Sequence, residues 1–174
     1  MSREDKMNEC KYLIGKEAEK CRIKIIGFST YATCQPLKNF IYEIIENKTY
    51  SSIEFDLTET ETLDSTNLGL LAKCAEYLRE FNMKPIIYSL KEDIDKILES
   101  VGFDKYFKIK HEKMTNTNEL KPLPENVELD RASLADMLLD THRSLIKLDG
   151  NNQRSFNKVI RLLEKRKEKV VSHN

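Results

Sequence analysis

Strand-like and helix-like segments alternate from about residue 12 to residue 110, and this alternation constrains the fold more than any other feature. The segment 22–26 is rich in β-branched residues, as is typical of strands, and the segment 51–57 is expected to be the next strand. Between them, apolar residues after Pro36 recur three and four positions apart, which predicts a helix that ends near Asn47. The apolar positions of this helix are Leu37, Phe40, Ile41, Ile44 and Ile45.

The same alternation continues downstream. The segment 67–81 has helical spacing, the segment 84–90 resembles a strand that starts at a proline, and the segment 92–103 is helical again. A short strand is expected at 106–110. Helix–strand alternation of this length is typical of an α/β fold with a mostly parallel sheet and helices beside it. We therefore expect one α/β domain over residues 1–110.

The C-terminal part of the chain has a different pattern. Residues 111–129 are polar and contain two prolines, which predicts a linker. Residues 130–170 carry two apolar stripes at helical spacing, which predict a helical hairpin joined near Gly150. Such a hairpin cannot be stable alone. Its stripes must pack on the α/β domain, on a second copy of the chain in a homodimer, or on another protein, and packing within the chain is the default.

Charge and composition narrow the classes of partner. The chain has 29 basic and 29 acidic residues, so no overall field attracts it to nucleic acid, and the basic residues near the C-terminus have no interleaved aromatics after Phe156. No apolar run approaches the roughly 18 residues of a membrane span, and the N-terminus does not resemble a secretory signal. The four scattered cysteines fit a reduced, cytoplasmic protein.

Motifs for catalysis, cofactors and metals are missing from the sequence. With five glycines, the chain has no glycine-rich phosphate loop, so no nucleotide cofactor is expected. The three histidines lie far apart, and none has a ligand-like neighbour at metal spacing. We expect His142 on a helix surface. Ser65 lacks the flanking glycines of a hydrolase nucleophile, so we expect no enzyme.

A polar cluster stands where the strand at 51–57 leads into the helix at 67–81. It is Asp64-Ser65-Thr66-Asn67, followed by Gly69. Such a cluster could cap the helix, supply a nucleophile, or accept a reversible modification, and from the residues alone capping is the preferred interpretation. Gly69 is most simply explained by a neighbouring segment that approaches the helix closely.

The cluster lies within a longer stretch that resembles the signature of the STAS domain, the fold of the anti-sigma factor antagonists. In that family a strand ends in Asp-Leu, and a turn leads to Asp-Ser-(Ser/Thr)-Gly-Leu-Gly at the start of a helix. The chain has Asp56-Leu57 and then Asp64-Ser65-Thr66-Asn67-Leu68-Gly69. The downstream stretch KPIIYSLKEDIDKILESVGFDKYFKI is also similar, and the C-terminal helices resemble the extension of a proteobacterial subgroup.

The resemblance implies a non-enzymatic partner switch. Unphosphorylated antagonist binds an anti-sigma factor or related regulatory protein. A serine kinase of the histidine-kinase-like ATPase type phosphorylates the serine of the motif, and a PP2C-type phosphatase removes the phosphate. By position the acceptor is Ser65, with Thr66 as second choice and Asp64 as the acidic neighbour. The family usually has glycine where this chain has Asn67. Asparagine is the next choice if that residue needs positive φ, whereas it alters which partner docks if the glycine serves to admit a partner's backbone.

Two expectations about the surface follow. A phosphate at a helix N-terminus is tolerated by the fold but opposes a partner packed on it. We expect partner contacts at Asp64 and Thr66, and at outward positions of the following helix. Those positions are Asn67, Lys73, Glu76 and Tyr77. The alternative is a STAS scaffold without a phospho-switch, which recruits partners through its C-terminal helices and uses Ser65 only as a cap.

Overall fold

The computed structural model describes residues 9–116, 119–124 and 130–171. The strands in these ranges are β1 (Cys10–Glu17), β2 (Lys20–Ser29), β3 (Ser52–Asp56), β4 (Thr60–Leu63), β5 (Ile86–Tyr88), β6 (Lys108–Lys110) and β7 (Lys121–Pro122). The helices are α2 (Gln35–Asn47), α3 (Ser65–Arg79), α4 (Glu92–Ser100), α5 (Phe103–Tyr106), α6 (Arg131–Leu148) and α7 (Gln153–Val171), with a 3-10 turn (Gly150–Asn152) before α7.

The described strands form one mixed sheet in the order β6-β5-β3-β2-β1-β7, and β4 pairs with the end of β2. The pairs β2–β3, β2–β4, β3–β5 and β5–β6 are parallel, whereas β1 is antiparallel to both β2 and β7. The predicted α/β fold with a mostly parallel sheet is therefore confirmed. β1 and β2 form a hairpin at the front of the chain, and helices connect β2 to β3, β4 to β5 and β5 to β6.

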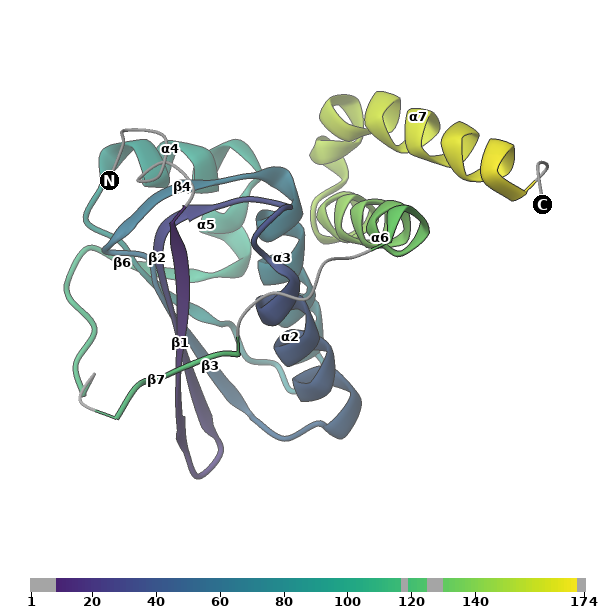
Figure 1. Ribbon diagram of the computed structural model, residues 1–174. Coiled ribbons are helices and arrows are strands. Elements are labelled where there is room, and N and C mark those ends of the chain that lie inside the picture. The colour runs from purple at the N-terminus through teal and green to yellow at the C-terminus, as the bar shows by residue number, and fades with distance from the viewer. Residues whose placement is uncertain (1–8, 117–118, 125–129, 172–174) are drawn as a thin grey trace.

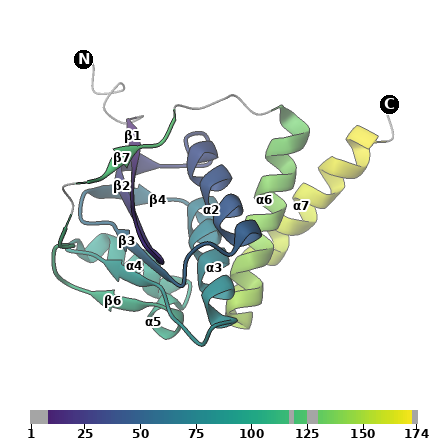
Figure 2. The same ribbon diagram turned by 90° about the horizontal axis from the view of Figure 1, so that it is seen from below.

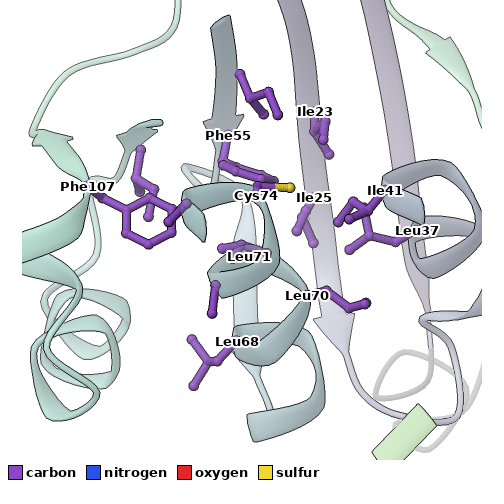
Figure 3. Packing of buried hydrophobic residues seen from close by; sticks show 14 of the residues in the cluster. Ile23, Ile25, Leu37, Ile41, Phe55, Leu68, Leu70, Leu71, Cys74 and Phe107 are labelled. Atoms are coloured by element: carbon purple, nitrogen blue, oxygen red, sulfur yellow. The ribbon is translucent and has the colours of Figure 1, made fainter. Parts of the chain in front are cut away.

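Alternation along the central strands separates the core from a charged face. Ile23 and Ile25 of β2 and Phe55 of β3 are completely buried against α2 and α3, where Figure 3 shows them among the side chains of both helices. On the opposite face of the same strands, Arg22 pairs with Glu54, 3.3 Å apart. Side chains two residues apart in a strand share a face, so this pattern fixes which side of the sheet the helices cover.

Helices form successive layers outward from the sheet. Figures 1 and 2 show α2 and α3 directly on the sheet, α6 beside α3, and α7 on the far side of α6. Met137, Leu145 and Leu148 of α6 belong to the same buried cluster as the sheet residues. The C-terminal hairpin thus packs within the chain, which was the default among the three predicted possibilities.

Two strands and one short helix were not predicted. β4 has the polar sequence TETL, and only Thr60 and Leu63 are buried in it; the Thr60 hydroxyl donates to the Ile25 carbonyl at 2.8 Å. β7 lies inside the segment expected to be a linker, and it pairs with β1 at the edge of the sheet, where a proline is tolerated. α5 follows Gly102, which has a positive φ of 78°.

Candidate functional site

The polar cluster forms the corner between β4 and α3, and Asp64 is the residue that caps the helix. One carboxylate oxygen accepts hydrogen bonds from the Asn67 backbone N–H at 3.0 Å and from the Asn67 side-chain amide at 2.9 Å. The other oxygen accepts from the Tyr31 backbone N–H at 2.6 Å. Because Asp64 caps α3, the hydroxyl of Ser65 at the first helical position is not needed for that purpose.

Asn67 connects this corner to the sheet. Its side chain is completely buried, and its carbonyl oxygen accepts a hydrogen bond from the Ser29 hydroxyl at 2.7 Å. Ser29 in turn bonds the Tyr12 hydroxyl at 2.7 Å. Asn67 is a helical residue and does not have positive φ. Of the two alternatives for this residue, positive φ does not apply, and the Asn67 side chain instead joins a buried hydrogen-bond network.

Ser65 is half-buried and faces a histidine from the C-terminal hairpin. Its hydroxyl oxygen lies 2.9 Å from Nε2 of His142, and Nδ1 of that ring lies 2.6 Å from the Leu138 carbonyl. Because a carbonyl only accepts, Nδ1 carries the proton, and Nε2 of the neutral ring accepts from the Ser65 hydroxyl. The expectation of a surface position for His142 is wrong, since the residue is 4% exposed and also contacts the Phe156 ring.

The Ser65–His142 pair is not the arrangement of a serine hydrolase. In a catalytic triad a carboxylate orients the histidine and stabilises its charged form. Here the second ring nitrogen bonds a main-chain carbonyl. A signal for the pair was available in the sequence, because His142 lies four residues after Leu138 and three before Leu145, on the apolar stripe of α6.

The other predicted contact positions on α3 are covered to different degrees. Thr66 is 2% and Tyr77 is 3% exposed, and the Tyr77 hydroxyl donates to the Tyr50 carbonyl at 2.6 Å. The expectation that Asn67 and Tyr77 lie outward is therefore wrong. The reason is that α3 is buried on two sides, by the sheet and by α6, whereas a single apolar stripe assumes one neighbour.

Lys73 and Glu76 keep partial exposure but pair with α6. The Lys73 ammonium lies 2.8 Å from Asp140, and Glu76 lies 3.2 Å from Lys147. Asp140 also accepts from the Tyr42 hydroxyl of α2. Burial disfavours the charged form of Asp140, but the hydrogen bond and charge of Lys73, helped by Tyr42, hold its pKa below the usual carboxyl value. Asp140 is therefore an anion that ties α6 to both α2 and α3.

Gly69 marks the closest approach of the two helices. A Cβ atom at this position would lie 2.3 Å from the backbone oxygen of Thr141 and 2.6 Å from its carbonyl carbon. Only glycine allows backbones to approach this closely. The predicted reason for Gly69, a neighbour that packs tightly on the helix, is confirmed, and the neighbour is α6.

Neither a metal-binding cluster nor a membrane-spanning helix occurs within residues 9–116, 119–124 and 130–171. These ranges contain no group of three His, Cys, Asp or Glu side chains that could ligate a metal ion. They also contain no helix with the length and apolar character needed to cross a bilayer.

Comparison with known proteins places the corner inside a family domain. The STAS domain model matches residues 17–116, which include the Asp64–Gly69 motif and end before α6. The anti-sigma factor antagonist SpoIIAA in its unphosphorylated form aligns with a TM-score of 0.52 at 15% identity, over 58% of this chain and 89% of SpoIIAA. An anti-sigma factor antagonist from Mycobacterium paratuberculosis aligns with a TM-score of 0.52 at 18% identity, over 60% and 87%. At these identities the likeness to solved structures shows the fold.

Proposed function

The chain belongs to the STAS domain family, and we propose that it is an anti-sigma factor antagonist controlled by phosphorylation of Ser65. In this proposal the unphosphorylated chain binds an anti-sigma factor or a related regulatory protein in the cytoplasm. A serine kinase of the histidine-kinase-like ATPase type adds the phosphate, and a PP2C-type phosphatase removes it. The observation that carries the proposal is the Ser65 hydroxyl at the start of α3, which Asp64 leaves free of any capping role.

The position suits a phosphate that the fold tolerates and a partner does not. A phosphate adds about −1.5 to −2 charges, and the first turn of a helix favours anions through its free N–H groups and its dipole. A partner packed on the same corner would have to desolvate the dianion. A loss of about 3 kcal/mol weakens binding by roughly two orders of magnitude. Thr66 is a poorer acceptor because it is 2% exposed.

The proposed partner surface surrounds this corner. Asp64, Lys73 and Glu76 supply charged groups that reach the surface of the α/β domain. Thr66, Asn67 and Tyr77 are buried and support the shape of that surface from beneath. Charged groups of both signs beside an apolar helix face favour a protein partner with complementary charges.

Phosphorylation itself is tested with the cognate kinase. The chain is incubated with this kinase and ATP, and intact mass is measured for wild type and for Ser65→Ala. We expect one phosphate on wild type and none on the variant. Wild type that gains no phosphate at Ser65 would favour the scaffold alternative.

We expect Ser65→Ala to keep the fold and remain bound to the target, whereas Ser65→Glu binds it about tenfold more weakly. A glutamate carries one charge where a phosphate carries up to two, so its effect is smaller. The target is captured from lysate with Ser65→Ala as bait, and affinities are then measured by calorimetry. Ser155→Glu is the control, because it adds the same charge at an exposed position of α7 rather than at the start of α3. Equal affinities of the alanine and glutamate variants at position 65 would contradict the proposal.

The scaffold alternative is favoured by one observation on α7. Leu162 is 54% and Val159 is 37% exposed, three residues apart on the same face of that helix. An exposed apolar pair of this kind could contact a partner through the C-terminal hairpin. The two functions are separated by the phosphorylation test above.

A further inference from the structure

We propose that α6 is an intramolecular lid over the partner-binding face of α3, and that it must lift before a target or a kinase can reach Ser65. The partner-binding role of the covered α3 face rests on the proposed function, whereas the existence and movement of the lid do not. The proposal starts from the position of α6. It covers the helix face that an antagonist would use, and it lies outside the matched family domain of residues 17–116.

The contacts between α6 and the α/β domain suit an interface that opens. Polar contacts that cross it join Ser65 with His142, both Lys73 and Tyr42 with Asp140, and Glu76 with Lys147. Partly exposed ion pairs contribute only about 0–1 kcal/mol each. Buried apolar residues of α6 supply the rest of the free energy that holds the interface closed, since Leu145 is completely buried and Met137 is 2% exposed. Interfaces of this mixed kind within one chain commonly permit relative movement.

The turn after α6 provides the end that stays attached. Asp149 pairs with Lys105 of α5 at 2.7 Å, and the side-chain amide of Asn152 donates to the Val101 carbonyl at 3.1 Å. These contacts are made with α5 and with the end of α4, and not with the corner that carries Ser65. His142 and Met137 lie seven and twelve residues before Asp149 along α6, where His142 contacts Ser65 and Met137 contacts Cys34. Movement about the attached turn uncovers the corner without releasing the hairpin.

The closed lid and the modification of Ser65 oppose each other. A kinase must place the hydroxyl oxygen in line with the transferred phosphoryl group, and the His142 ring occupies a position 2.9 Å from that oxygen. After transfer, the serine oxygen has no proton to donate. The phosphate on that oxygen also needs the space that the His142 ring occupies 2.9 Å away in the closed lid. The phosphorylated chain therefore cannot restore this contact.

The lid lowers the affinity of the chain for its target by mass action. The apparent dissociation constant equals the intrinsic one divided by the fraction of open molecules. If about 1% of the molecules are open, the target binds roughly 100-fold more weakly than it would bind an uncovered α3. Any variant that weakens the lid should strengthen target binding by the same factor as it increases the open fraction.

A native cysteine reports the movement. Cys34 is completely buried, and its sulfur lies 3.8 Å from the Met137 sulfur of α6. Burial, together with the charge of Asp64, raises the pKa of this thiol to about 12. Because the thiolate is the reactive species, a closed lid suppresses alkylation. Cys21 and Cys74 are also completely buried, but they lie between the sheet and α3, so they report unfolding of the domain.

The experiment measures alkylation of the full chain by iodoacetamide under native conditions, with the rate at each cysteine read by peptide mass spectrometry. We expect Cys34 to react at least tenfold faster than Cys21 and Cys74. Asp140→Asn should accelerate the Cys34 reaction several-fold. Asp136→Asn should not, because Asp136 pairs with Lys167 inside the hairpin, at 2.6 Å.

Equal rates at the three cysteines would overturn the lid, because they would show that Cys34 is exposed only when the whole domain unfolds. Equal effects of the two asparagine variants would overturn the role of Asp140 in closing it. These rates require neither kinase nor target. A chain that is not phosphorylated at Ser65 would thus contradict the proposed function and leave the lid intact, and the reverse also holds.

Discussion

Replacing Gly69 with alanine is expected to displace α6 while the α/β domain stays folded. The new methyl group would lie 2.3 Å from the Thr141 backbone oxygen, a distance that no real Cβ contact shows, and a backbone cannot rotate away as a side chain can. Within α3 itself alanine is the better helix former, by about 0.5–1 kcal/mol. Overpacking of this kind costs about 3 kcal/mol, and the cost falls on the contact between the two helices.

Two measurements on Gly69→Ala separate displacement of the lid from general damage. Alkylation of Cys34 should accelerate by roughly two orders of magnitude, the factor that corresponds to about 3 kcal/mol, while Cys21 and Cys74 remain protected. Gly150→Ala is the matched control, because a Cβ there has no neighbour within 4 Å. If Cys34 in Gly69→Ala reacts no faster than in Gly150→Ala, α6 does not depend on close packing at this point.

The parts of the fold that could be predicted are those where one physical rule dominates. The strand at residues 22–26 is β-branched and buried on one face, and the helix after Pro36 has a single apolar stripe, so both were predicted close to their observed bounds. β4 could not be predicted, because its four residues are mostly polar and pairing with β2 determines it. β7 consists of two residues, one of them a proline, and only the neighbouring β1 makes it a strand.

In the candidate site, too, the residues that could be predicted are those within one local pattern. The motif identified Ser65 and Asp64, and the isolated glycine in a helix indicated a close neighbour at position 69. The partner of Ser65 was missed because His142 is separated from it by 77 residues, in a different segment of the chain. Asn67 and Tyr77 were placed on the surface because one stripe was taken as the whole buried face. A helix between two layers, such as α3 between the sheet and α6, has two buried faces, and periodicity reveals only the more apolar of them.

The missed partner of Ser65 and the wrong surface positions of Asn67 and Tyr77 have the same cause. α6 contributes nothing to the family domain of residues 17–116, yet it decides which residues of α3 are covered. Local patterns describe α3 and α6 separately, whereas their contact depends on a small residue, an ion pair and a histidine that are far apart in sequence. The contact between α3 and α6 is therefore the part of the site that the pattern of α3 alone could not predict.

Removal of the Asp64 carboxylate should cost more than the loss of an ordinary helix cap. In Asp64→Ala the cap of α3 disappears, at about 1 kcal/mol. The Asn67 side-chain amide also loses its acceptor inside a completely buried position, and the Tyr31 N–H loses a bond of 2.6 Å. An unpaired buried polar group costs about 1–3 kcal/mol. We expect the free energy of unfolding to fall by about 3 kcal/mol, measured by urea denaturation.

Asp130→Ala provides the matched comparison, because Asp130 caps α6 through bonds within its own first turn. Its carboxylate accepts from the Ala132 N–H at 2.9 Å, and from the Ser133 N–H and hydroxyl at 3.0 and 2.7 Å. Those donors are exposed, so water replaces the lost acceptor, and the expected cost is about 1 kcal/mol. The difference between the two variants measures what Asp64 contributes by joining α3 to the end of β2. If both variants lose the same stability, Asp64 is only a cap, and the network through Asn67 and Ser29 does not hold the corner in place.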